Sequence, residues 1–147
     1  MGAVVRDPLS VRNARRVIQL PAELLLAKQL ADALKTPICL VDADGNPVHY
    51  NEAAETLLGH GRAGIEALTP PELGARLAFT NIEGTPIPVE QLPVMIALQE
   101  LRPAHRWLDV IDLHGVRQRV EATAFPVKGD DGELLGAVAL FWQAELF

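Results

Sequence analysis

The sequence predicts one α+β domain, in which helices cover one face of a five-stranded antiparallel sheet and a helical extension precedes it. Three observations support this prediction. The 147 residues are 49% hydrophobic and 22% charged, which suits a single core of ordinary size. Short apolar segments of strand length alternate with Gly-containing turns in both halves of the chain. Segments of helical periodicity lie before and between them, and this order is typical of helices packed on an antiparallel sheet.

The first 34 residues are predicted to form two helices. In SVRNARRVIQL, apolar and basic residues fall on opposite sides of a helix, and Ser10 is a candidate cap. In PAELLLAKQLADALKTP, Pro21 suits a first helical position and Pro37 marks the end. The leucines of this second segment make the apolar face of the helix wider than packing against a single neighbour requires. This width indicates that the helix packs on both the domain and a partner.

A hairpin and a short helix are predicted next, over residues 38–59. The segments ICLV and PVHY are strand-like and are separated by the turn DADGN. Asn51 suits a helix cap, and Gly59 suits the end of that helix, because glycine adopts the left-handed conformation most easily. Residues 61–79 mix Gly and Pro with short apolar pieces, which predicts short helical turns.

The second half predicts a helix and three strands. PVMIALQEL has helical spacing, with Pro93 in its first turn. HRWLDVIDLHGVRQRVEATAFPV alternates over two strands that turn at His114-Gly115, and a GDDG turn leads into ELLGAVALFWQ. This last strand is apolar on both faces, so the face turned away from the helices needs a cover. We expect residues 11–34 to supply it, from the same chain or from a second subunit.

Three segments in this order resemble the PAS family of bacterial sensory domains. PICLVDADGNPVHYNEAAETLLG is similar to the opening hairpin and first helix of such domains. EGTPIPVEQLPVMIALQE is similar to their connector and long helix, and HGVRQRVEATAFPVKGDDGELLGAVALFW to their closing strands. The resemblance covers Leu30 to Trp142. It implies a PAS-like five-stranded antiparallel sheet with helices on one face, formed by residues 35–147, behind a helical extension of residues 1–34.

The resemblance also implies sensing and protein contact, because PAS domains enclose a cavity, often dimerise through an N-terminal helix and pass signals to neighbouring domains. We therefore expect a cytoplasmic regulatory homodimer in signal transduction, with a kinase, cyclase or transcription regulator as candidate partner. The chain ends in FWQAELF without the Asp-x-Thr motif that couples many such domains to an output helix, so we expect action by association or within a longer protein. The expected dimer interface is Val11, Val17, Ile18, Leu24, Leu25 and Leu26.

Any small ligand is expected to bind between the sheet and the helices. The alternative is a closed core filled by the same side chains, in which case the module is a ligand-free protein-protein interaction domain. The candidate ligand-binding residues are Tyr50, Phe79, Asn81, Met95, Leu98, Trp107, Arg119 and Val120.

No cofactor is evident from the residues, and haem and flavin are both disfavoured. Flavin-photosensing PAS domains carry a reactive Cys in an Asn-Cys-Arg motif, whereas the single Cys39 lies in the first predicted strand. Haem-binding PAS domains use a His on the long helix, and residues 89–101 contain none. Cys39, His49, His60 and His114 also lack the spacing of metal ligands.

Other classes of function are less well supported by the sequence. The carboxylates lie in turns, strands and a short helix without a nucleophile and base beside them, so we expect no enzyme. Four Arg against one Asp in residues 1–20 make the first predicted helix basic, and a nucleic-acid-binding regulator is the weakest alternative. No apolar run reaches the roughly 18 residues of a spanning helix, so no membrane contact is expected. A single cysteine indicates a reducing compartment.

Overall fold

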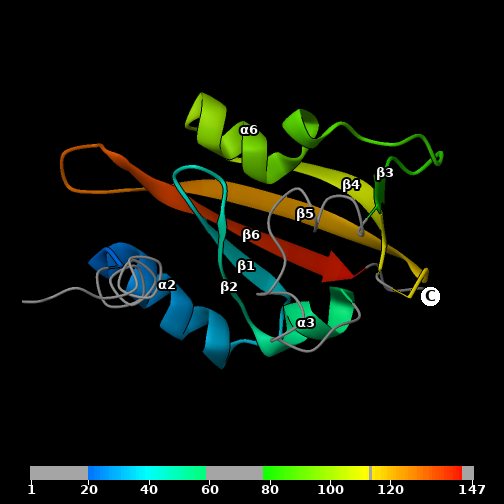
Figure 1. The fold of residues 1–147 in the computed structure, drawn as a ribbon, viewed down its shortest axis with the longest axis horizontal. Helices are drawn as coiled ribbons and strands as arrows, with labels where there is room; N and C mark the ends of the chain where they lie inside the picture. The colour runs from blue at the N-terminus through cyan, green and yellow to red at the C-terminus, as the bar shows by residue number, and fades with distance from the viewer. Residues whose placement is uncertain (1–19, 59–77, 113, 144–147) are drawn as a thin grey trace, which may run out of the picture.

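Six antiparallel strands form one sheet in the computed structural model, which describes residues 20–58, 78–112 and 114–143 (Figure 1). Across the sheet the strands follow the order β2-β1-β6-β5-β4-β3. The strands are β1 (Ile38–Asp42), β2 (Pro47–Tyr50), β3 (Ala78–Thr80), β4 (Ala104–Ile111), β5 (Arg117–Lys128) and β6 (Leu134–Gln143).

The predicted count of five strands is corrected to six by β3, at the edge of the sheet. This strand has three residues, and Ala78 pairs with Ile111 of β4. Three residues are too few to show a period of two, so the segment could not be recognised by its pattern. The predicted short helical turns before it, in residues 59–77, lie outside the described residues, as do residues 1–19 with the predicted basic helix.

Helices lie on both faces of the sheet (Figure 1). On one face are α3 (Glu52–Leu58), the single-turn 3-10 helix η1 (Val89–Gln91) and α6 (Pro93–Glu100). On the other face, α2 (Ala22–Ala33) packs its Ala31 against Ile38 and Leu40 of β1 and Val138 of β6. This part of the expected cover is therefore supplied by the same chain.

The glycine at position 136 allows this close packing of α2, β1 and β6. A Cβ atom built on Gly136 would clash with the backbone carbonyl of Val41 and would lie 3.3 Å from the side chain of Leu24. Any larger residue would push β6 away from β1 or from α2. The absence of a side chain at this position thus brings three elements together.

Asn51 joins the end of α2, the start of β1 and the start of α3. Its amide nitrogen donates to the carbonyl oxygens of Ala31 and Thr36, both at 2.8 Å. Its side-chain oxygen accepts from the backbone N–H of Ile38 at 3.0 Å and of Ala54 at 2.9 Å, the second bond being a helix cap. The side chain is 1% exposed, so these bonds are shielded from water.

We expect Asn51→Ala to lower the free energy of unfolding by about 3 kcal/mol, because two buried N–H groups and two carbonyls lose their partner together. The measurement is urea denaturation followed by circular dichroism. The control is Asn46→Ala, which removes one long, partly exposed contact of 3.4 Å to Asp42. Equal losses in the two variants would contradict the central role of Asn51.

No helix within the described ranges is long and apolar enough to span a bilayer.

Candidate ligand cavity

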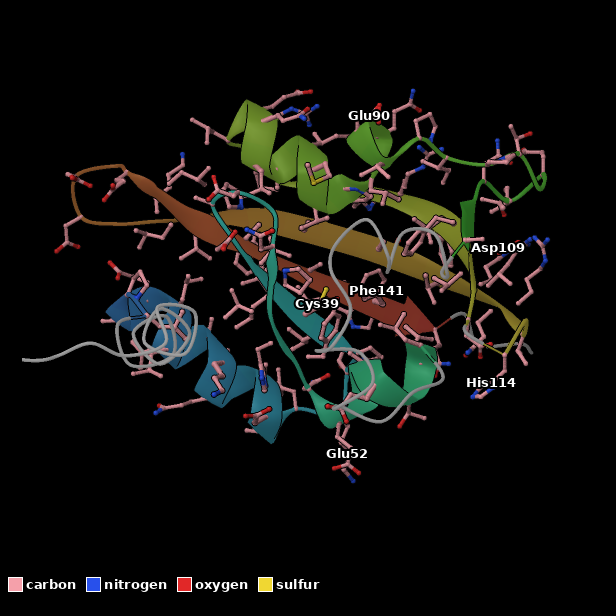
Figure 2. All side chains as sticks on the ribbon, viewed as in Figure 1. Cys39, Glu52, Glu90, Asp109, His114 and Phe141 are labelled. Carbon is pink, nitrogen blue, oxygen red and sulfur yellow. The ribbon has the colours of Figure 1, made fainter. Side chains whose placement is uncertain are left out.

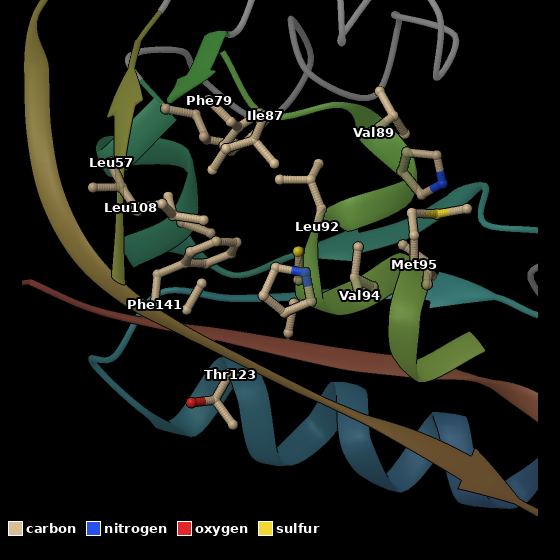
Figure 3. A pocket seen from close by; sticks show the side chains of 18 of the residues that line it. Leu57, Phe79, Ile87, Val89, Leu92, Val94, Met95, Leu108, Thr123 and Phe141 are labelled. Atoms are coloured by element: carbon tan, nitrogen blue, oxygen red, sulfur yellow. The ribbon is translucent and has the colours of Figure 1, made fainter. Parts of the chain in front are cut away.

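A cavity of about 430 Å3 lies between the sheet and the helices α3 and α6 (Figure 3). This volume is within the range of small-molecule sites in proteins, about 300–1,000 Å3. Figure 2 shows the side chains of Cys39 and Phe141 in the interior, whereas those of Glu52 and His114 extend outward. The apolar side chains of the wall include Leu57, Phe79, Ile87, Leu92, Val94, Met95, Leu108 and Phe141.

Four residues of the described wall have polar side chains, but two of these side chains turn away from the cavity. The hydroxyl of Thr80 donates to the carbonyl of Asn81 at 3.0 Å and accepts from Arg117 at 3.3 Å, on the outer side of the sheet. Thr123 lies on the far side of β5 in the close-up view (Figure 3). Cys39 and Tyr50 remain, and they are direct cross-strand partners in the β1–β2 hairpin.

Both of these side chains are uncharged at neutral pH. Burial raises the pKa of the Cys39 thiol to about 12. Burial, and then the neighbouring Cys39, raise the pKa of Tyr50 above its ordinary value of 10.0. The described part of the wall contains no Lys, Arg, His, Asp or Glu. The described part of the wall is therefore apolar, with one polar corner.

The hydroxyl of Tyr50 has no hydrogen-bond partner among the described residues, although Tyr50 is only 5% exposed. No side-chain nitrogen or oxygen in the described part of the chain is both fully enclosed and without a partner. The hydroxyl therefore keeps access to open space, and Tyr50 is part of the cavity wall.

The predicted ligand-binding residues divide into three groups. Tyr50, Phe79 and Met95 line the cavity. Leu98 and Val120 are buried in the neighbouring core, outside the described wall.

Asn81, Trp107 and Arg119 lie away from the cavity, which corrects the prediction for these three residues. The side chain of Asn81 accepts from the backbone N–H groups of Glu83 and Thr85 in a turn. Leu108 of β4 faces the core, so the alternation of the strand puts Trp107 on the outer face, where it is 48% exposed. Arg119 is on the same outer face.

Arg119 belongs to an ionic cluster around Asp109, a carboxylate that is 1% exposed (Figure 2). The Nε atom of Arg119 lies 2.9 Å from Oδ1 of Asp109, and the Nη1 atom of Arg117 lies 3.0 Å from Oδ2 of the same carboxylate. Hydrogen bonds from Arg119, and then from Arg117, hold the pKa of Asp109 below its ordinary value, although burial acts in the opposite direction. Because Arg117 also contacts Thr80, the cluster joins β3, β4 and β5 on the outer face.

Most of the apolar wall, including Leu57, Ile87 and Phe141, was not predicted from the sequence. One signal could have found Cys39, because a hairpin that places Tyr50 inward places its cross-strand partner inward too. No comparable signal was present for Ile87, which lies in the irregular segment between β3 and η1.

The predicted dimer residues are also separated by the structure. Leu24 is 1% exposed and packs within its own chain, so its side chain is not available to a second subunit. Leu25 and Leu26 are 42% and 65% exposed. Val11, Val17 and Ile18 lie outside the described residues, so their role stays a prediction.

Within residues 20–58, 78–112 and 114–143, no three His, Cys, Asp or Glu side chains are placed to share a metal ion.

Comparison with known proteins identifies the family. A family model described as the PAS fold matches residues 31–144. Because this match covers most of the chain, the chain belongs to the PAS family, whose members are generally sensory or signalling modules. A comparison with curated protein sequences gives no significant match.

Solved structures show the same fold. The PAS domain of Bordetella pertussis BvgS matches with a TM-score of 0.58 and 20% identity, over 84% of this chain and 86% of that chain. The PAS domain of the fruit-fly ELK potassium channel matches with a TM-score of 0.62 and 15% identity, over 84% and 98%. The LOV protein of Rhodobacter sphaeroides matches with a TM-score of 0.61 and 11% identity, over 85% and 69%.

We expect Cys39 to react with a thiol reagent roughly 1,000-fold more slowly in the folded protein than in urea at pH 8. The reason is the rise of the thiol pKa from 9.0 to about 12, which lowers the fraction of reactive thiolate by that factor. The measurement is the rate of reaction with iodoacetamide, with the urea-unfolded protein as control.

The same pKa shift sets the sign of a pH dependence. A raised pKa in the folded state stabilises the protein below pH 9.0, and this contribution is lost as the pH rises toward about 12. We expect wild type to lose about 1 kcal/mol more of its free energy of unfolding than Cys39→Ala between pH 8 and pH 10. Equal losses, or rapid alkylation of the folded protein, would contradict the burial of the thiol.

Proposed function

We propose that this chain is a regulatory PAS module that binds a small molecule in its core and acts as a homodimer. The observation that carries the proposal is the cavity of about 430 Å3, with a mostly apolar wall and one polar corner. Convergence of a few polar groups in an apolar pocket is typical of small-molecule sites. A ligand-free domain with a filled core is the alternative that this cavity disfavours.

The structural relatives do not identify the ligand. Their identities of 11–20% support a shared fold, and the proteins named include a potassium channel and a LOV protein. For this chain, flavin photochemistry through a cysteine is not part of the proposal. Its single cysteine, Cys39, lies in β1, and burial keeps the thiol protonated.

Native mass spectrometry of the purified, untagged protein tests the proposal. We expect a dimer that carries the additional mass of a retained small molecule, and that loses it after unfolding and refolding. A dimer without additional mass, together with no thermal shift across a metabolite panel, would contradict the ligand part and favour a protein-interaction module.

The proposed dimer contact uses the exposed apolar surface on the α2 side of the sheet. Leu26 and Leu30 lie one turn apart on α2 and are 65% and 61% exposed. On the open part of the sheet, Trp107 and Trp142 each pair with Glu121 and therefore lie in one row on this face. They are 48% and 44% exposed. Apolar groups gathered in this way are typical of protein contact sites.

We expect the double variant Leu26→Lys and Leu30→Lys to be monomeric, because two leucines that the proposed dimer contact would cover are replaced by charges that the contact cannot accommodate. Size-exclusion chromatography with light scattering measures the mass. The control is Gln29→Lys, an exposed position on the same helix. Since both leucines are exposed in the single chain, the melting temperature of the monomer should remain close to that of the control. A double variant that stays dimeric would contradict the assigned contact.

A further inference from the structure

We propose that the cavity selects a neutral, mostly apolar molecule, and that one hydrogen-bond acceptor of this molecule binds the hydroxyl of Tyr50. This inference rests on the proposed ligand-binding function and specifies its chemistry.

The hydroxyl of Tyr50 is the polar group in the wall that a ligand can satisfy. Tyr50 is 5% exposed as a whole, its hydroxyl has access to the cavity, and the described residues offer this hydroxyl no partner. Polar side chains inside a protein almost always have a hydrogen-bond partner in the protein or in ordered water, and a bound ligand can take the place of that water. The apolar part of the wall cannot supply one, so an acceptor on the ligand would complete the site.

The hydroxyl acts as a donor. Burial raises the pKa of Tyr50, so the phenol keeps its proton at neutral and moderately alkaline pH. The neighbouring thiol of Cys39 is also protonated and is only a weak donor. A carbonyl or ether oxygen on the ligand is the complementary group.

The wall disfavours an anionic ligand. A carboxylate in an apolar site needs a cation or several strong donors to replace its hydration. Among the described residues that line the cavity there is no Lys, Arg or His. Arg117 and Arg119, which could provide the charge, are bound to Asp109 on the outer face of the sheet.

The size and lining of the cavity favour a flat apolar body. The volume of about 430 Å3 equals that of roughly 14 water molecules in the liquid, at about 30 Å3 each. In the close-up view, the side chains of Phe79, Ile87, Leu92 and Phe141 point toward a common space (Figure 3). Aromatic rings and a methionine sulfur pack favourably against another ring, and Met95 lies in the same wall.

Three matched probes separate these contributions. 2-Acetylnaphthalene carries a neutral acceptor, 2-ethylnaphthalene lacks it, and 2-naphthoate replaces it by an anion. Equilibrium dialysis at pH 7 measures their dissociation constants. We expect wild type to bind the ketone about 10-fold more tightly than the hydrocarbon, as one buried neutral hydrogen bond allows, and to bind the naphthoate more weakly than either.

The test variant is Tyr50→Phe, which removes the hydroxyl alone. We expect it to bind the ketone and the hydrocarbon equally well, with the affinity for the hydrocarbon unchanged. Because no described residue loses a hydrogen bond, its melting temperature should equal or exceed that of wild type. The matched control is Thr123→Val, which removes a hydroxyl that points away from the cavity. Ala122→Met, which fills space beside the wall, should weaken all three probes if they bind inside.

The outcomes are distinguishable. Equal binding of ketone and hydrocarbon by wild type, or tightest binding of the naphthoate, would overturn the role of Tyr50 and leave the ligand cavity standing. Binding that Ala122→Met does not weaken would place the probes outside the cavity and overturn the inference. Failure of wild type to bind any of the three would overturn the inference, and with a negative metabolite panel it would overturn the ligand-binding function too.

Discussion

The arrangement of the domain depends on the buried amide of Asn51. Its donors and acceptor connect α2, β1 and α3, and its bonds satisfy backbone groups at the ends of these elements and, at Thr36, in the connection between α2 and β1. Helix and strand ends leave backbone groups without partners, and burying them unsatisfied is costly. One side chain that satisfies several of them at once fixes where α2 ends, where the sheet begins and in which direction α3 leaves the hairpin. Asn51 therefore helps to position both α2, which covers one face of the sheet, and α3, which borders the cavity on the other face.

The two faces of the sheet are stabilised by different physical means. Around the cavity the packing is apolar, and the polar atoms of Cys39 and Tyr50 are uncharged. On the outer face, beyond the reach of α2, the buried carboxylate of Asp109 is balanced by two half-exposed arginines. This cluster holds the short strand β3 without using apolar side chains. An edge strand of three residues can therefore contribute Phe79 to the cavity wall while its other side is fixed by charge.

The sequence predicted those features that depend on local chemistry. The hairpin turn, the cap at Asn51 and the order of the five predicted strands follow from residue types at short spacing, and the described part of the structure has them. The six-stranded count could not be predicted, because β3 is too short to have a pattern. Alternate residues of β4 were predicted to face opposite sides of the sheet. Because the neighbours Trp107 and Leu108 are both large and apolar, the pattern did not show which of them faces the cavity. The volume of a cavity depends on how many side chains fit together, and no single residue of the sequence encodes it.

The adjacency of Tyr50 and Asn51 has a structural consequence. The side chain of one reaches the cavity, and the side chain of its neighbour holds the end of α2 and the start of α3. A single peptide bond thus separates Tyr50, which lines the cavity, from Asn51, which holds α2 on the opposite face through a hydrogen bond. A molecule that touches Tyr50 in the cavity therefore sits one residue away from the amide on which the end of α2 and the start of α3 both depend. The cavity wall and the contacts that position the covering helix thus share one short stretch of backbone, and the side chains of two consecutive residues serve the two purposes.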